Sequence, residues 1–178
     1  MYYKKLDISI TSIVRESKAF LKTEPRIMNR TDDVTFNFTD NNTVFDKIPS
    51  IRRTFSKMGL TCTKASFFVM YMQEHCTIHS DVVNYPYRIN IPILNCKDSS
   101  TVFYRGGLVE TTYNVNGRPR HTVINEEDCV EVDRVKLDAA TILDVSELHK
   151  VILTPKTKVP RISLTLSFAE ELGLELLA

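Results

Sequence analysis

The stretch RISLTLSF, residues 161–168, alternates strictly between polar and apolar side chains. Because successive side chains of a β-strand point to opposite faces, this pattern predicts a strand with one apolar and one polar face. The apolar face comprises Ile162, Leu164, Leu166 and Phe168, and the polar face comprises Arg161, Ser163, Thr165 and Ser167. An apolar face packs against a neighbouring layer, which leaves the polar face to line a cavity that could hold an anion. The alternative is an exposed edge strand with Arg161 in solvent.

Seven further segments upstream are short, rich in β-branched and aromatic residues, and separated by turn-forming stretches, which predicts strands. They are residues 64–72, 87–94, 100–104, 109–115, 129–137, 140–145 and 150–154. No helix-length segment lies between them, so parallel βαβ winding is disfavoured. An antiparallel barrel or jelly roll is favoured.

The residues before Gly59 have the period of a helix instead. Residues 8–22 place apolar side chains at spacings of three and four, and residues 43–58 do the same. Pro49 lies inside the second pattern and predicts a break or a late start there. We therefore expect a single domain, residues 1–178, with a helical N-terminal part in residues 1–60 and a β core in residues 61–178: a mainly β fold with N-terminal helices.

Composition argues against several classes of protein. The chain has 23 Lys and Arg against 22 Asp and Glu, so nothing supports nucleic-acid binding. No apolar run approaches the roughly 18 residues needed to cross a bilayer, and the first residues lack the apolar centre of a signal peptide, so we expect a cytoplasmic protein. The 4 cysteines form no C-x-x-C pair, which argues against a zinc knuckle or a disulfide framework.

The sharpest local motif is TIHSD, residues 77–81, in which His79 and Asp81 are two residues apart. In an extended chain both side chains point to the same side, so an imidazole and a carboxylate can converge on one metal ion. A surface histidine near an aspartate is the common alternative for such a short motif. A third ligand could be His149, which precedes Arg161 by 12 residues.

Two histidines and one carboxylate leave three positions open on an iron ion, as non-haem Fe(II) oxygenases require. Arginine's planar fork can bind a carboxylate through two parallel hydrogen bonds, and a hydroxyl two residues on can add a third. Arg161 and Ser163 have this spacing. The pattern therefore predicts a metal site with an anion clamp beside it.

From about Ala65 to Phe168 the sequence resembles the Fe(II)/2-oxoglutarate-dependent oxygenase superfamily. The resemblance rests on the H-x-D motif, on a late histidine, and on the R-x-S that follows it. It implies a double-stranded β-helix, which is a cupin-like jelly roll. It also implies that His79, Asp81 and His149 bind Fe(II), and that Arg161 and Ser163 bind the cosubstrate 2-oxoglutarate.

The stretch HSDVVNYPYRINIPI, residues 79–93, is similar in motif to aspartyl/asparaginyl hydroxylase-like and amino-acid hydroxylase-like members. This likeness implies that Arg88 faces the cavity and touches a carboxylate of the cosubstrate or substrate. Tyr71 corresponds loosely to a tyrosine that some members place on the cosubstrate, and a place in the core is its alternative. His75 and His121 are expected at the surface, with His121 in a polar loop.

The resemblance implies hydroxylation of an unactivated C–H bond in a small molecule, an amino acid or a peptide, with succinate and CO2 as co-products. Halogenation is disfavoured because Asp81 occupies the position where a halide would bind. The first rival is a non-catalytic cupin-like module that binds a metal or a ligand, and the second is a structural β-protein. The triad with an anion clamp favours catalysis, because a scaffold needs neither.

Overall fold

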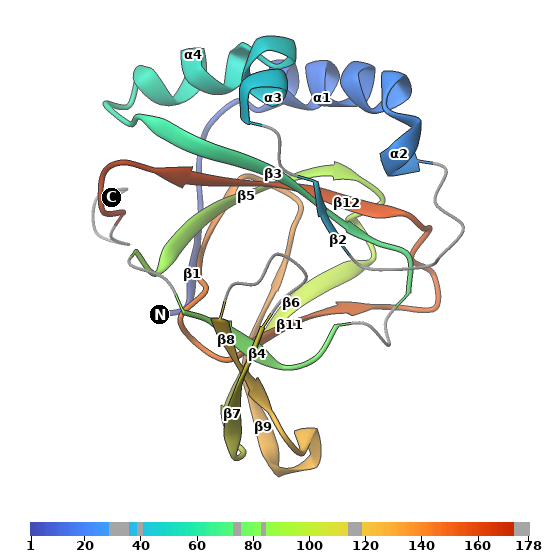
Figure 1. Ribbon diagram of the computed structural model, residues 1–178, viewed down its shortest axis with the longest axis vertical. Coiled ribbons are helices and arrows are strands. Elements are labelled where there is room, and N and C mark those ends of the chain that lie inside the picture. The colour runs from blue at the N-terminus through green and yellow to red at the C-terminus, as the bar shows by residue number, and fades with distance from the viewer. Residues whose placement is uncertain (29–35, 39–40, 73–75, 83–84, 114–118, 173–178) are drawn as a thin grey trace.

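The computed structural model describes residues 1–28, 36–38, 41–72, 76–82, 85–113 and 119–172. In this part of the chain two six-stranded antiparallel sheets face each other, and helices cover the outer side of one of them (Figure 1). The helices are α1 (Thr11–Thr23), α2 (Pro25–Met28), α3 (Asn41–Lys47), α4 (Ser50–Ser56) and the 3-10 turn η1 (Glu126–Asp128). The strands are β1 (Tyr3–Lys5), β2 (Phe36–Phe38), β3 (Cys62–Met70), β4 (His79–Asp81), β5 (Tyr87–Leu94), β6 (Ser99–Gly106), β7 (Val109–Tyr113), β8 (Pro119–Val123), β9 (Cys129–Lys136), β10 (Thr141–Asp144), β11 (His149–Leu153) and β12 (Arg161–Phe168).

The first sheet has the strand order β1-β10-β5-β12-β3-β2, and the second has the order β7-β8-β4-β11-β6-β9. Antiparallel pairing throughout agrees with the prediction from the strand-rich sequence. No described helix is long and apolar enough to cross a membrane.

Strand β12 lies inside the first sheet, where it pairs with β3 on one side and β5 on the other. Its residues Ile162, Leu164 and Leu166 are fully buried in the largest apolar cluster of the protein. On the opposite face Arg161 is only 1% exposed and Ser163 only 2%. The prediction of a two-faced strand is therefore confirmed, and the alternative of an exposed edge strand is wrong.

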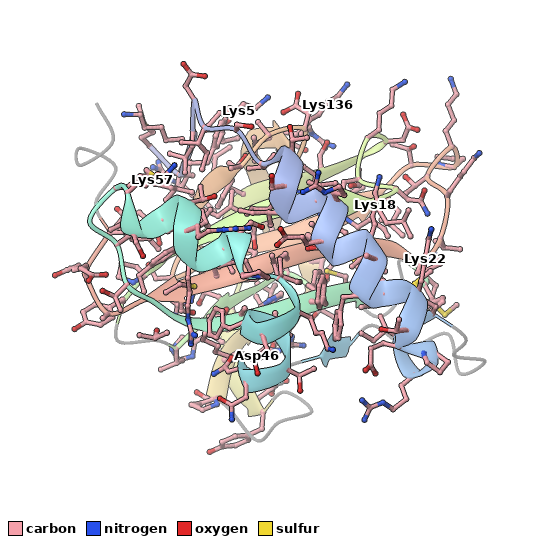
Figure 2. All side chains as sticks on the ribbon, turned by 90° about the horizontal axis from the view of Figure 1, so that it is seen from above. Lys5, Lys18, Lys22, Asp46, Lys57 and Lys136 are labelled. Atoms are coloured by element: carbon pink, nitrogen blue, oxygen red, sulfur yellow. The ribbon has the colours of Figure 1, made fainter. Side chains whose placement is uncertain are left out.

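The helices pack on the outer face of this sheet, as seen from above in Figure 2. Helix α1 turns Ile13, Phe20 and Leu21 toward the sheet, while Lys18 and Lys22 lie on its solvent side. The apolar spacing of three and four that predicts this helix is thus the spacing of its buried face. The large cluster combines these helices with β3, β5 and β12, so it spans both the N-terminal 60 residues and the rest of the chain.

The second helical segment is interrupted at Pro49, as the sequence predicts. Helix α3 ends at Lys47 and α4 begins at Ser50. Proline has no backbone N–H to continue the hydrogen-bond ladder of a helix, but it is tolerated where a helix begins. The Pro49 carbonyl accepts a hydrogen bond from Arg53 N at 3.2 Å, so the proline is the N-cap of the new helix.

Two strands have no signal in the sequence. Strand β1 lies in the N-terminal part that is expected to be helical, and β8 occupies Pro119–Val123, where a polar loop is expected. The expectation that His121 lies in a loop is wrong, because it pairs with Ser80 of β4 and with Thr111 of β7. A polar strand between two partners obtains its extended conformation from their backbone hydrogen bonds and needs no apolar period of its own.

The space between the sheets is of mixed polarity. Phe103 and Leu143 belong to one small apolar cluster there, and Met70 and Val151 belong to another. Between them lie buried polar residues from both sheets: Ser99, Thr101, His149, Arg161 and Ser163. The main apolar core thus lies outside the sheet pair, and the inner space is available for chemistry.

Replacing Leu164 by Ala should lower the free energy of unfolding by about 2–5 kcal/mol, because it opens a cavity under the helix layer where the side chain is fully buried. Urea unfolding followed by circular dichroism measures this change. The control is Val130→Ala, at a side chain that is 67% exposed, which should shift stability by no more than about 0.5 kcal/mol. Equal effects of the two substitutions would contradict this assignment of the core.

Candidate active site

Two of the histidines predicted as ligands are direct neighbours across the second sheet. His79 of β4 and His149 of β11 are cross-strand partners, and their ring centroids are 4.7 Å apart at an interplanar angle of 47°. Directly opposite residues of an antiparallel pair project from the same face, which explains how residues so distant in sequence meet. The structure therefore brings both imidazoles to one place between the sheets.

Each imidazole is anchored through the same ring nitrogen. His79 Nδ1 lies 2.8 Å from the Thr77 carbonyl, and His149 Nδ1 lies 2.9 Å from the Glu147 carbonyl. A carbonyl only accepts hydrogen bonds, so in both rings Nδ1 carries the proton and donates it. The Nε2 lone pair is then available in each ring. An Nδ1 held by a backbone carbonyl is the usual support of a histidine that binds a metal through Nε2.

The electrostatic surroundings keep the first of these histidines neutral. Burial, and after it the neighbouring His149, lowers the pKa of His79 from its ordinary value of 6.5 to about 3. A neutral imidazole is the form that binds metal ions, because a protonated ring has no free lone pair.

The third predicted ligand, Asp81, follows His79 on the same strand and is partly buried. Its backbone N–H donates to the Val145 carbonyl at 2.8 Å, whereas its carboxylate takes part in none of the ion pairs and hydrogen bonds of the described residues. No three His, Cys, Asp or Glu side chains among these residues stand together as a metal-binding group. The structure thus pairs the imidazoles and leaves the Asp81 carboxylate outside the pair.

These residues nevertheless fit a divalent iron ion. Two imidazoles that are anchored through Nδ1, and a carboxylate two residues along the strand of His79 that has no partner among the described residues, form a nitrogen and oxygen donor set. Such a set suits Fe(II) and leaves coordination positions open.

Arg161 occupies the same inter-sheet space from the first sheet. Its Nε donates to Ser99 Oγ and its Nη1 to Ser163 Oγ, both at 3.1 Å, and its Cζ lies 6.0 Å from the centroid of the Phe68 ring. In the described ranges no carboxylate forms an ion pair with it, and burial lowers the pKa of the guanidinium. A buried cation without a counter-ion is costly. The side chain is therefore prepared to receive an anion.

The arginine lies farther along the strands than the histidines. Ser99, which accepts from Arg161, pairs with Leu153, whereas Phe103 pairs with His149. Four residues of strand separate these two levels, which is roughly 13 Å at about 3.3 Å per residue. Long side chains from both ends shorten the gap, so a short dicarboxylate is the kind of molecule that could bridge the two.

Sequence reasoning missed the residues that support this arrangement. Ser99 and Thr101 share a face with Phe103 and are buried, and the sequence of residues 99–103 has no alternation that would single them out. Glu126 lies in the acidic 3-10 turn η1. Its Oε1 accepts from the backbone N–H of Ile78 at 2.8 Å, and its Oε2 pairs with Lys150 Nζ at 2.6 Å. It thus ties together the residues adjacent to both histidines, and no sequence signal points to it.

Two further residues singled out by the sequence have hydrogen-bond partners of their own. Arg88 donates through Nη1 to the carbonyls of Tyr85 and Tyr87, at 2.6 and 2.8 Å, and these contacts hold it at the start of β5. Tyr71 donates to the Ile27 carbonyl at 2.6 Å and packs against the helix-side core, so its core alternative holds and the cavity position is wrong.

The remaining histidines lie away from the imidazole pair or outside the description. His121 is exposed and pairs with Ser80, so it projects from the face opposite His79. His75 lies outside the described residues.

No protein-family model and no curated protein sequence matches the chain. Solved structures do resemble it. The non-heme alpha ketoglutarate dependent epimerase SnoN from nogalamycin biosynthesis has a TM-score of 0.52 at 11% identity, over 94% of this chain and 77% of that one. HygX from Streptomyces hygroscopicus, with nickel and 2-oxoglutarate bound, has a TM-score of 0.53 at 9% identity, over 92% and 80%. The non-heme alpha ketoglutarate dependent carbocyclase SnoK, also from nogalamycin biosynthesis, has a TM-score of 0.53 at 12% identity, over 93% and 79%. At these identities the likeness is one of fold.

Replacing Arg161 by Met should stabilise the ligand-free protein, because it removes a buried charge without a counter-ion and keeps an apolar stem of similar length. The expected gain is about 1–4 kcal/mol in the free energy of unfolding, by analogy with buried charges replaced by apolar residues. Urea unfolding in a chloride buffer measures it. Arg134→Met, at an exposed ion pair with Glu131, is the control and should change stability by less than about 1 kcal/mol. A loss of stability in Arg161→Met would identify this arginine as a structural residue.

Proposed function

We propose that this protein is an Fe(II)- and 2-oxoglutarate-dependent oxygenase with a double-stranded β-helix core. Its reaction is the hydroxylation of an unactivated C–H bond in a small molecule, an amino acid or a peptide. His79, Asp81 and His149 hold the iron, and Arg161 with Ser163 holds the distal carboxylate of the cosubstrate. One observation carries the proposal: a cross-strand pair of imidazoles with free Nε2 atoms shares the inter-sheet space with a buried arginine that has no counter-ion among the described residues.

The fold likeness supports this assignment. HygX is described with nickel and 2-oxoglutarate, and SnoN and SnoK are described as alpha ketoglutarate dependent. SnoN is described as an epimerase and SnoK as a carbocyclase, so these neighbours support the cosubstrate class, and hydroxylation is the part of the proposal that rests on the sequence resemblance.

Iron and 2-oxoglutarate, when bound, would supply the oxidising power: one oxygen atom of dioxygen would enter succinate as CO2 is released, and the other would enter the substrate. The chain supplies position. The Thr77 and Glu147 carbonyls orient the imidazoles, and the Asp81 carboxylate can turn toward them because none of the described residues holds it. Productive orientation and exclusion of water are the largest contributions that a protein can make to such a reaction.

Arg161 orients the cosubstrate in this scheme. Its guanidinium is oriented by hydrogen bonds to Ser99 and Ser163, and an incoming carboxylate would supply the counter-ion that the described residues do not provide. The apolar cluster of Met70, Cys76 and Val151 lies beside this position and limits water around the charge pair. Arg88 is a second candidate for a carboxylate contact with the cosubstrate or the substrate, as the likeness to the hydroxylase-like members implies.

The direct test is aerobic turnover with added Fe(II), measured as succinate formed from 2-oxoglutarate, followed by a screen of substrate classes for a mass gain of one oxygen atom. A non-catalytic cupin-like module would bind the metal or the anion and form no succinate. That outcome, with both ligands demonstrably bound, would replace the proposed function by the binding module.

Arg161→Met should weaken 2-oxoglutarate binding by about 2–4 kcal/mol, because it removes the partner of the distal carboxylate, while iron binding is retained. Anaerobic calorimetry with Fe(II) and then 2-oxoglutarate separates the two events. Because the same variant is expected to be more stable when free, unfolding cannot explain the loss. Unchanged cosubstrate affinity would remove Arg161 from the site.

His149→Ala should abolish succinate formation and weaken Fe(II) binding by at least about tenfold, because it removes one of the two oriented imidazoles. His121→Ala is the matched control, since this histidine lies on the opposite face of the sheet and should retain most of the turnover. The reverse ranking would assign the third ligand to His121 and would contradict the proposed site.

A further inference from the structure

We propose that Arg120 binds an acidic group of the substrate, so that the substrate is a small molecule carrying a carboxylate or a phosphate. This inference rests on the proposed function, because it concerns the substrate of that reaction. The anion site itself is formed by side chains that are not proposed to bind the metal or the cosubstrate.

Arg120 is placed beside the histidine pair by strand pairing. In the second sheet β8 lies next to β4, and the directly opposite residues are Thr122 with His79 and Arg120 with Asp81 (Figure 1). Opposite residues project from the same face, so Arg120 shares the face of the predicted ligands, whereas His121 projects the other way. On this face, the pair of Arg120 and Asp81 is therefore the next one along the strands from the pair of Thr122 and His79.

This guanidinium is incompletely bonded. Its Nε is buried without a hydrogen-bond partner, and its one hydrogen bond among the described residues, from Nη2 to Thr77 Oγ1, is long at 3.4 Å. Asp81 lies directly opposite, yet it does not pair with Arg120 among the ion pairs of the described ranges. A buried charged donor left unsatisfied costs free energy, which a bound anion would recover.

The hydrogen bonds of Arg120 contrast with those of an arginine that is paired with a carboxylate. Arg134 donates from Nε and Nη2 to both carboxylate oxygens of Glu131, at 2.8 and 2.7 Å. Arg161 belongs to the first sheet and to the cosubstrate in the proposed function, whereas Arg120 belongs to the second sheet. Neither Arg161 nor Arg120 has a carboxylate partner among the described residues. Because they belong to opposite sheets, each can bind a different anion.

The surroundings of Arg120 also suit an oxygen-rich group. Thr112 is its cross-strand partner on β7, and Thr112 Oγ1 lies 2.6 Å from Thr122 Oγ1, so hydroxyls flank the guanidinium on the same face. On the other side of the imidazole pair, the Phe103 ring lies 6.3 Å from His149 and stacks with Tyr2 at 5.1 Å. The imidazole pair thus has Arg120 and threonine hydroxyls on one side and the aromatic rings of Phe103 and Tyr2 on the other. A small aromatic acid has groups that match both sides, so it is a suitable probe.

Anchoring an acidic group at Arg120 would hold the rest of the substrate over the imidazole pair. The arginine fork binds a carboxylate or a phosphate through two parallel hydrogen bonds, which fixes orientation as well as affinity. Arg120 is thus a specificity-determining residue for the proposed reaction.

The test follows the Nε–H signal of Arg120 by NMR in the full chain, with and without zinc(II) and 2-oxoglutarate. The probes are benzoate, phenyl phosphate and the uncharged benzamide. Benzoate or phenyl phosphate should shift the signal saturably, benzamide should not, and the tighter anion identifies the acidic group. No saturable shift with either anion under either condition, or an equal shift with benzamide, would overturn the inference.

Variants separate this site from the cosubstrate site. Arg120→Gln should weaken binding of the preferred anion by at least about tenfold, since a charge-assisted hydrogen bond is lost, while Arg134→Gln leaves it unchanged. Arg120→Lys keeps the charge without the fork and should fall between the wild type and Arg120→Gln.

Calorimetry with 2-oxoglutarate on the same variants distinguishes the two proposals. Retained cosubstrate binding in Arg120→Gln supports a separate substrate site. If this variant instead loses 2-oxoglutarate as well, Arg120 serves the cosubstrate and the inference is wrong. If the wild type binds no 2-oxoglutarate but keeps the Arg120-dependent anion, the proposed function fails and the anion site stands.

Discussion

The pairing of β11 with β4 on one side and β6 on the other is the constraint on which the site depends. It sets His149 opposite His79, and a slip by one residue would put Lys150 in its place, because side chains alternate between faces. Glu126 opposes such a slip from the outer face, since it bonds both Lys150 and the backbone of Ile78. One carboxylate thus connects the neighbours of both histidines and fixes the register of their strands.

A second feature of the fold is the place of its apolar core. The largest cluster lies between the helices and the first sheet, so most of the apolar burial occurs outside the sheet pair. Strand β12 takes part in both environments: Leu164 faces that cluster, whereas Arg161 faces the inner space. The apolar burial on one face of β12 can offset the free-energy cost of the buried charge on its other face. A small domain can tolerate a buried charge in this way.

The arginines of the inner space differ from the exposed arginines in their partners. The exposed arginines Arg26, Arg53 and Arg134 pair with carboxylates, whereas Arg161 and Arg120 have hydroxyl partners among the described residues. Both flank a pair of imidazoles, one of which burial keeps neutral. The two arginines favour anionic ligands in this space, and the imidazole pair and the Asp81 carboxylate offer donors to a metal ion, a combination that agrees with the proposed oxygenase chemistry.

Local periodicity is what the sequence by itself determined. The alternation in residues 161–168 predicted a two-faced strand, the apolar spacing before Gly59 predicted helices with a break at Pro49, and the spacing of His79 and Asp81 placed them on one side of the chain. These properties depend on residues a few positions apart. Which strands lie side by side is decided by contacts between distant segments. The tertiary structure alone therefore placed His149 against His79, made β8 a strand, and aligned Arg120 with Asp81, because polar strands carry no apolar period that reveals their partners.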